Sequence, residues 1–205
     1  MMILICVYRI RDLLSVLSII LIICTLEQLF YLCACMIAIC TLQVIPAEVV
    51  LLYELSFPVE ERRNLSAQQE LLEAGTLQLQ IVKNDDVFAG FVFCWLLTDF
   101  IFIEHFAIDA SQRGGGIGSK VITLLQSQYP RIVLEVEPPH STDAGRRIRF
   151  YEGLGFQSYP YSYRQPSYLA GGEPLEMLLM QTGMPAGEDA FSGISSEIYR
   201  EVYGI

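Results

Sequence analysis

The sequence predicts a mixed α/β domain in which helices lie on both faces of a central sheet. Strand-like apolar runs alternate with helix-like segments in the order β-α-α-β-β-β-α-β-α-β-β, and such alternation is typical of layered α/β architectures. The chain has 205 residues and an apolar content of 53%, enough for one domain, or one domain plus an appendage. A glycine-rich loop at residues 113–118, between a strand-like and a helix-like segment, is the third observation.

The first half of the domain is expected to contain two helices and four strands. Val50, Leu51 and Leu55 are near helical spacing, and Pro58 follows as a helix breaker. A charged, helix-forming segment comes next and leads to Gly75, a stop signal. We expect a strand ending at residues 42–46, helices at 47–55 and 59–72, and strands at 77–82, 87–97 and 101–108, with a turn at 83–86.

The second half is expected to contain the remaining helices and the closing strands. Pro130 precedes an apolar strand, and Asp143 is a candidate cap for the next helix, which contains Tyr151 and ends at Gly153 or Gly155. We expect a helix at 119–128, a strand at 132–136, a loop at 138–143, closing strands at 156–161 and 175–180 around a polar, tyrosine-rich stretch at 162–173, and a short helix at 195–203.

The loop from Arg113 to Gly118 presents free backbone N–H groups to an anion. The first N–H groups of a helix have no partner within it, and the helix dipole adds partial positive charge there. Glycines lack the Cβ atoms that would keep a phosphate at a distance. Two common phosphate loops fail on register: a Walker A loop needs lysine directly after its last glycine, and G-x-G-x-x-G from Gly114 needs glycine where Ser119 stands.

A third pattern fits the loop. Arg113, Gly116 and Gly118 occupy the defining positions of Arg/Gln-x-x-Gly-x-Gly/Ala, and the loop resembles the acetyl-CoA loop of the GNAT superfamily of N-acyltransferases. Three more stretches resemble, in order, the strand before that loop, the central strand and a helix ending in Tyr-x-x-x-Gly-Phe: residues 104–109, 132–137 and 149–156. The resemblance covers about residues 42–205, and three signatures in order are more specific than one glycine loop.

This resemblance implies a GNAT acyl-CoA N-acyltransferase fold, with a mixed, mostly antiparallel central sheet. It implies acetyl-CoA as co-substrate and direct transfer of the acetyl group to a primary amine in a ternary complex. Cys94 lies in a strand away from the motifs, so no cysteine is placed for a covalent route. The acceptor would be a small-molecule or peptide amine, and the sequence identifies neither the acceptor nor the oligomeric state.

The same resemblance implies the residues that bind the co-substrate. The backbone groups of Phe106, Ala107 and Ile108 would pair with the pantetheine arm, and one of these N–H groups would polarise the thioester carbonyl. The diphosphate would lie against the loop and the first helical turn, at Arg113, Gly114, Gly115, Gly116, Ile117, Gly118 and Ser119.

Three residues are candidates for catalysis. The resemblance places Tyr151 near the sulfur of the co-substrate, where it would protonate the departing thiolate; without that resemblance it would be a packing tyrosine. Glu104 and Glu135 are carboxylates inside apolar strands, where burial would raise the pKa of a general base. Either could instead be a structural carboxylate, and a water chain could act as the base. His105 is expected to face the opposite side of its strand from Glu104.

The charge of the chain argues against nucleic acid as a partner. The net charge is −10 and the pI is near 4.6, whereas phosphates need a basic face. An acidic surface would favour a cationic acceptor such as an amine. No metal site is expected, because Cys33-x-Cys35 lacks ligand spacing and partner histidines.

The amino-terminal segment, residues 1–41, differs from the expected catalytic domain, residues 42–205. It contains five of the six cysteines and two uncharged runs, each too short for a bilayer core of about 30 Å. We interpret it as an apolar extension, or as the product of a start assigned too early, with Met36 as the true start. A membrane anchor is the alternative. A cytoplasmic enzyme is the favoured reading, over a non-catalytic acyl-CoA-binding module or a membrane-tethered interaction protein.

Overall fold

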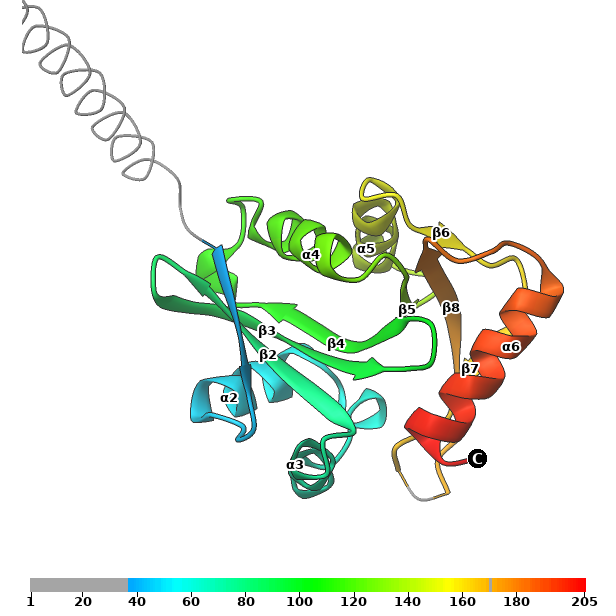
Figure 1. Cartoon of the computed structure of the whole chain (residues 1–205), viewed down its shortest axis with the longest axis horizontal. Helices are drawn as coiled ribbons and strands as arrows, with labels where there is room; N and C mark the ends of the chain where they lie inside the picture. The colour runs from blue at the N-terminus through cyan, green and yellow to red at the C-terminus, as the bar shows by residue number, and fades with distance from the viewer. Residues whose placement is uncertain (1–36, 170) are drawn as a thin grey trace, which may run out of the picture. The chain divides into compact units, whose positions relative to one another are not determined.

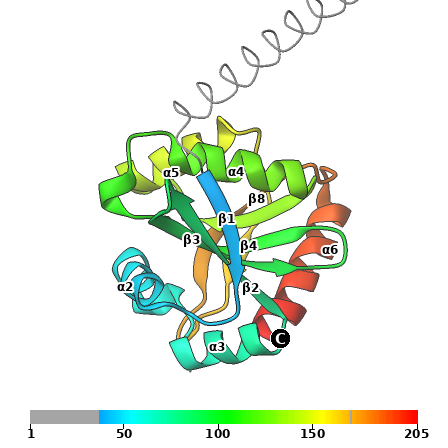
Figure 2. The same ribbon diagram turned by 60° about the vertical axis from the view of Figure 1, so that its left-hand side comes forward.

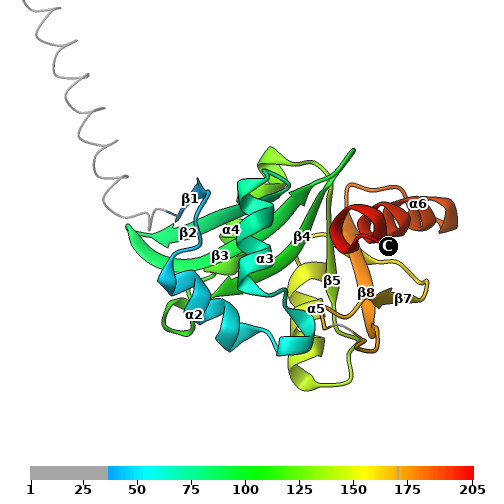
Figure 3. The same ribbon diagram turned by 90° about the horizontal axis from the view of Figure 1, so that it is seen from below.

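Helices lie on both faces of the sheet in the computed structural model, which describes residues 37–169 and 171–205 (Figure 1). Helices α4 (Ile117–Gln128) and α5 (Thr142–Glu152) cover one face. Helices α2 (Ala47–Ser56) and α3 (Leu65–Glu73) cover the other, and both lie in front of the sheet in Figure 3. Helix α6 (Glu188–Ile198) packs on this second face, where Ile194 and Ile198 join the same core cluster as Leu179.

The sheet is antiparallel except at one place. Its order is β1-β2-β3-β4-β5-β8-β6, with β7 also paired to β8, and only β4 and β5 are parallel. Strand β1 lies at one edge (Figure 2). The bounds are β1 Ile37–Leu42, β2 Leu77–Asn84, β3 Val87–Leu96, β4 Ile101–Ile108, β5 Ile132–Val136, β6 Gln157–Ser158, β7 Tyr163–Gln165 and β8 Leu175–Thr182. The mixed, mostly antiparallel sheet predicted above is confirmed.

Two hydrophobic clusters, one on each face, hold the helices to the sheet. Strand β3 shows why, because its side chains alternate between the faces. Phe91, Phe93 and Trp95 belong to the cluster under α2 and α3, whereas Val92 and Cys94 belong to the cluster under α4 and α5. Each of these five side chains is at most 1% exposed. The central strands are therefore buried on both sides, as their apolar runs predict.

The prediction of one helix at 59–72 is wrong, because non-helical backbone interrupts this segment. A short 3-10 turn, η1 (Val59–Glu61), is followed by extended backbone at Arg62. Helix α3 then starts at Leu65, with Asn64 as its N-cap: the Asn64 side chain accepts hydrogen bonds from the N–H groups of Ser66 at 2.8 Å and Ala67 at 3.4 Å. Asparagine is among the best caps, so it starts a new helix within a segment of high helix propensity.

Replacing Asn64 with alanine should lower the free energy of unfolding by about 1 kcal/mol, because two N–H groups of α3 would lose their acceptor. Urea unfolding followed by circular dichroism measures this. An unchanged midpoint and slope would show that the start of α3 does not depend on its cap.

Other boundaries also differ from expectation. The cap of α5 is Ser141, whose Oγ accepts from the N–H of Ala144 at 3.0 Å, while Asp143 lies in the first turn. The tyrosine-rich stretch contains strand β7, the first of the two closing strands shrinks to the two residues of β6, and α6 starts at Glu188 instead of 195. The expected division after residue 41 falls inside β1, which pairs with β2 over its whole length.

The amino-terminal segment up to residue 36 lies outside the described residues, and so do the expectations about it. In the part of the chain that the structure describes, none of the helices has both the length and the apolarity of a membrane span.

Candidate active site

The candidate site lies where strands β4 and β5 separate. The two strands pair over three positions only, residues 101–103 with 132–134. Beyond these positions, at Glu104 and Glu135, the pairing between the two strands ends, so the edge of β4 that faces β5 is free. A cavity of about 620 Å³ occupies this position. We call it the central cavity.

The central cavity is lined from both faces of the sheet. Arg113 and Tyr151 come from the face covered by α4 and α5, whereas Leu52 and Leu55 come from α2 on the opposite face. Residues of β4 from Ile103 to Ile108 form the wall between them. Side chains from both faces of the sheet therefore meet beside β4 in one cavity.

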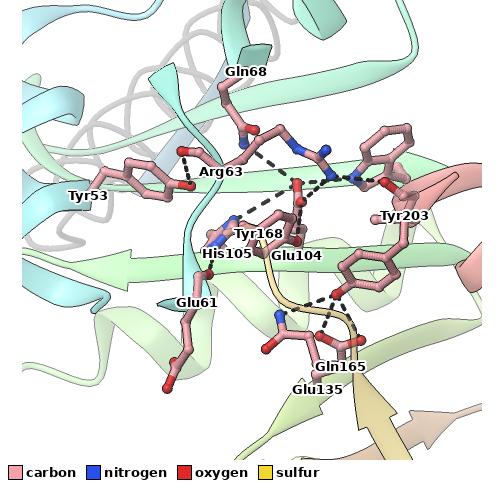
Figure 4. A network of polar contacts seen from close by, with 12 residues as sticks. Tyr53, Glu61, Arg63, Gln68, Glu104, His105, Glu135, Gln165, Tyr168 and Tyr203 are labelled. Atoms are coloured by element: carbon pink, nitrogen blue, oxygen red, sulfur yellow. Dashed lines mark hydrogen bonds and ion pairs between the residues drawn. The ribbon is translucent and has the colours of Figure 1, made fainter. Parts of the chain in front are cut away.

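A β-bulge in β4 turns Glu104 and His105 toward the same face. In β3, Phe93 pairs with His105 and the next residue, Cys94, pairs with Ile103, so Glu104 is the extra residue. Figure 4 shows the two side chains side by side on the face covered by α2 and α3. The expectation that they face opposite sides is wrong, because a bulge interrupts the alternation of the strand.

Glu104 is an ionised carboxylate surrounded by donors. Its side chain is 0% exposed and accepts from Arg63 Nη2 at 3.0 Å, Trp95 Nε1 at 3.0 Å and the Tyr168 hydroxyl at 2.7 Å. Burial alone would raise the pKa of Glu104, but nearby His105 and Arg63, together with these hydrogen bonds, outweigh it and hold the pKa below its usual range. A carboxylate held in this way is suited to organising the site.

His105 is held by its backbone partner and by aromatic rings. Its Nε2 lies 2.9 Å from the carbonyl oxygen of Glu61, which fixes that nitrogen as the donor. The ring packs edge-on against Tyr53 and Phe57, with centroid distances of 4.9 and 4.7 Å. Burial lowers the pKa of His105, against the nearby charge of Glu104, which raises it.

Glu135 differs from Glu104 because no cation contacts it among the described residues. The hydroxyl of Tyr163 donates a short hydrogen bond to one of its oxygens, and the hydroxyl of Tyr203 lies 3.0 and 2.9 Å from the two oxygens. Burial, and then the charges of Glu104 and Glu61, raise the pKa of Glu135 to about 7, against the hydrogen bonds from the two tyrosines. Glu135 also lines the central cavity, so its proton affinity suits a general base at neutral pH.

Tyr151 lies on the α5 side of the central cavity. Its ring is 7% exposed and packs edge-on against Phe150 and Phe156, with centroid distances of 5.0 and 5.4 Å. Burial raises the pKa of the Tyr151 hydroxyl to about 12, despite the opposing effect of Arg147. The hydroxyl is therefore protonated at neutral pH and can act as an acid.

The glycine loop connects β4 to α4 and leaves the start of that helix open. Gly114 and Gly116 have positive φ angles of 88° and 71°, a conformation that favours glycine. Gly116 is the N-cap of α4, and no side chain caps the helix. A Cβ atom would meet nothing within 4 Å at Gly114, Gly115 or Gly116, so the space beside the loop is open. The loop therefore needs glycine at 114 and 116 for its backbone conformation and not for lack of space.

The helix after the loop begins two residues earlier than expected. It starts at Ile117, so Ile117, Gly118 and Ser119 form its first turn, and their N–H groups have no partner within the helix. Arg113 is fixed at the other end of the loop, where its Nε donates to the carbonyl oxygen of Ile108 at 2.9 Å. An anion at this position would meet the first N–H groups of α4 and a guanidinium group.

The structure brings Glu104, Glu135 and Tyr151 together around the central cavity, with Phe106, Ala107, Ile108 and Arg113 on the same wall. Several partners of the carboxylates were not identified from the sequence. Arg63 belongs to a charged stretch that also fits a solvated helix face, and Tyr203 comes from the far end of the chain. Four tyrosines lie between residues 159 and 168, and two of them, Tyr163 and Tyr168, bind the two carboxylates. Tyr159 and Tyr161 instead pack against Phe191.

Two known proteins share substantial sequence identity with this chain. "Putative acetyltransferase YjbC" of Bacillus subtilis (strain 168) is 30% identical over 127 residues, which are 60% of this chain and 64% of that protein. The chain thus spans less than two thirds of the length of this relative. A solved structure, "Putative acetyltransferase from GNAT family from Bacteroides thetaiotaomicron", is 36% identical, with a TM-score of 0.74, and the match covers 77% of this chain and 91% of that one.

A more distant structure shares the fold. It is yncA of Salmonella typhimurium, solved with its cofactor acetyl-CoA; it is 15% identical with a TM-score of 0.52, and the match covers 76% of this chain and 97% of that one. Residues 47–156, just over half of the present sequence, match the sequence model of the acetyltransferase (GNAT) family. This range includes β4, the glycine loop and Tyr151. The chain therefore belongs to the acetyltransferase (GNAT) family.

Proposed function

We propose that this protein is an N-acetyltransferase that moves the acetyl group of acetyl-CoA to a primary amine by direct attack in a ternary complex. One observation carries the proposal. A single cavity, lined from both faces of the sheet, brings Arg113 of the glycine loop together with a tyrosine that stays protonated and a carboxylate whose pKa is about 7.

The donor side of the cavity fits acetyl-CoA. The loop from Arg113 to Ser119 would hold the diphosphate through free N–H groups and a guanidinium group. From there, the free edge of β4 at Phe106, Ala107 and Ile108 offers backbone groups to the two amides of the pantetheine arm. This arrangement would direct the thioester toward Glu135 and Tyr151, which line the same cavity.

The acceptor amine would enter from the α2 side. There the cavity is lined by Leu52, Leu55 and Phe57, with Glu61 as the charged group. An amine that carries an apolar body would match this wall, while the carboxylates favour its positive charge on entry.

The reaction requires three groups around the thioester. An acceptor that enters as an ammonium ion first loses one proton to solvent, because only the neutral amine has a free lone pair. The amine nitrogen then attacks the carbonyl carbon and passes a second proton to Glu135, directly or through a water molecule. A backbone N–H of β4 donates to the carbonyl oxygen as it gains negative charge. The C–S bond then breaks, and Tyr151 protonates the departing thiolate of CoA. Glu104, which is ionised and surrounded by donors, holds this side of the site in shape.

A covalent route through Cys94 is not favoured. Its side chain is buried in β3, and burial, then the charge of Glu104, raises the pKa of the thiol to about 12. Direct attack by the amine needs no such nucleophile.

A thiol-release assay tests the proposal. Purified protein, acetyl-CoA and a panel of primary amines, including amines with apolar bodies, should release CoA in proportion to acetylated amine, which mass spectrometry identifies. If the protein binds acetyl-CoA tightly and turns over none of the amines, the non-catalytic binding module is favoured instead.

Replacing Tyr151 with phenylalanine should lower kcat by about 100-fold with little change in the Kd for acetyl-CoA, because the acid is lost and the ring packing is kept. Stopped-flow kinetics and calorimetry measure the two quantities. Tyr159→Phe is the control, since its hydroxyl donates to the carbonyl oxygen of Pro185, outside the central cavity. A large loss of affinity in Tyr151→Phe would contradict a role confined to proton transfer.

A further inference from the structure

The last turn of the chain reaches both buried carboxylates. This turn, the π-helix η3 (Tyr199–Tyr203), follows α6 directly and lies outside the family match at residues 47–156. The carbonyl oxygen of Val202 accepts from Arg63 Nη2 at 2.9 Å, and the same nitrogen lies 3.0 Å from Glu104. The hydroxyl of Tyr203 lies 3.0 and 2.9 Å from the two oxygens of Glu135. One short segment thus bridges β4 and β5 where the strands separate.

The two tyrosines of the π-helical turn make different contacts. Tyr199 stacks flat on Tyr163, with ring centroids 5.4 Å apart and planes 3° apart, and its hydroxyl donates to the carbonyl oxygen of Arg164. Tyr203 points into the site, toward Glu135 (Figure 4). The turn is closed by a hydrogen bond from Ile205 N–H to the Tyr199 carbonyl and by Gly204 in the left-handed conformation. Such π-turns are frequent at functional sites.

The hydrogen-bond directions around Tyr203 are fixed by its neighbours. An ionised carboxylate only accepts, so the single hydroxyl proton of Tyr203 is directed at Glu135. The oxygen of Tyr203 in turn accepts from Gln165 Nε2 at 3.2 Å. Burial raises the pKa values of Tyr163 and Tyr203 well above their ordinary range, so both phenols stay protonated. Both hydroxyls therefore stabilise the charged form of Glu135.

We propose that Tyr203 is a positioning residue for Glu135, and that the carboxyl-terminal turn brings Tyr203 and the carbonyl group of Val202 into the active site. The proposal rests on the role of Glu135 as general base given under Proposed function. The Tyr203 hydroxyl lies within hydrogen-bond distance of both oxygens of the base, which restrains the orientation of the carboxylate. The same turn also acts on Glu104, because the carbonyl oxygen of Val202 and the carboxylate of Glu104 both accept from Arg63.

The direction in which Tyr203→Phe should shift the pKa of Glu135 follows from the groups around it. The groups that shift the pKa of Glu135 most are Tyr163 from β7, Tyr203 from η3, Glu104 from β4 and Glu61 from η1. Tyr168 and Tyr199 also lie close enough to interact with its charge. Tyr163 and Tyr203 favour the carboxylate through hydrogen bonds, and the two glutamates disfavour it. Tyr203→Phe removes one donor and leaves the like charges in place. It should therefore raise the pKa of Glu135, by about one pH unit.

The experiment compares Tyr203→Phe with Tyr199→Phe in the full chain. The control variant loses a hydroxyl from the same turn, but that hydroxyl bonds the backbone of Arg164 and not Glu135. For each protein, kcat/KM is measured against pH with an acceptor whose own amine titrates below pH 5. The acidic limb of this profile is the range in which kcat/KM rises as Glu135 loses its proton. It should move to higher pH by about one unit in Tyr203→Phe and stay in place in Tyr199→Phe. Equal limbs in wild type and Tyr203→Phe would overturn the proposal.

A readout that needs no turnover separates this proposal from the proposed function. Carboxyl-carbon NMR of ¹³C-labelled glutamate follows the titration of Glu135 directly, and Glu135→Gln assigns the signal. An upward shift in Tyr203→Phe together with a matching shift in the rate profile supports the proposal. A titration that is the same in wild type and Tyr203→Phe overturns it. A shift in the NMR titration without any shift in the rate profile overturns the role of Glu135 as base, and with it the positioning role in catalysis.

Discussion

Replacing Gly116 with glutamate should weaken acetyl-CoA binding by at least about 100-fold, because a like charge facing an anion in a binding site costs several kcal/mol. Gly116 is the N-cap of α4, so the new carboxylate would lie where the diphosphate is proposed to bind. It would compete for the same free N–H groups that the diphosphate needs. Isothermal titration calorimetry with acetyl-CoA measures the change in Kd.

Two control variants test whether the loss of affinity depends on where the new side chain lies. Gly75 follows α3 and has nearly the same φ angle, 74° against 71°, and an added Cβ at either position meets nothing within 4 Å. Gly75→Glu therefore has the same backbone cost and the same charge, but it lies outside the loop, and its affinity should match wild type. Gly118→Ala should also bind normally, because its Cβ would meet Phe150 at an ordinary 3.4 Å. Equal loss of affinity in Gly75→Glu would refute the loop as the diphosphate site.

The fold was predictable where short-range rules decide the structure. Strands β4 and β5 match the expected ranges, because both are short apolar runs bounded by turns or a proline. The break before α3 was missed because most residues from 59 to 72 favour a helix, and only the cap at Asn64 marks the new start.

The candidate site was predictable as motifs but not as a network. Glu104 and Glu135 stand out as carboxylates in apolar strands, whatever their partners are. The bulge at Glu104 depends on register with β3, which no local pattern specifies. Arg63 and Tyr203 reach the site across 41 and 68 residues of sequence, and neither belongs to a recognisable motif. Partners of this kind are selected by tertiary packing, so the sequence alone could not assign them.

Replacing Glu135 with glutamine should lower kcat/KM by about 100- to 10,000-fold, the usual range for losing a general base. The amide keeps the size of the side chain and can still accept from Tyr163 and Tyr203, so the loss is confined to proton transfer. In the wild type, activity should rise with pH through about 7 as Glu135 loses its proton. That limb should be absent from Glu135→Gln when the acceptor amine titrates below pH 5.

Glu104→Gln is the matched control, since the same change is made on the neighbouring strand. Glu104 has its pKa held low and already receives several hydrogen bonds, so it does not give rise to a limb near pH 7. Its charge does raise the pKa of Glu135, and its removal should therefore move the acidic limb to lower pH. A Glu135→Gln variant that keeps both its rate and its limb would transfer the role of base to a water chain or to another residue.

The two variants should also differ in how stability depends on pH, with opposite signs. The pKa of Glu135 is higher in the folded protein than in the unfolded chain, so its contribution to stability is present below the unfolded pKa and is lost as pH rises through about 7. Glu135→Gln should therefore lose less stability than wild type between pH 5 and pH 8. The pKa of Glu104 is lowered on folding, so its contribution is present above the unfolded pKa and lost in acid, and Glu104→Gln should flatten the acid side instead. Urea unfolding from about pH 3 to pH 8 measures both slopes. Because these slopes need no substrate, they test the protonation of the two carboxylates even before the acceptor amine is known.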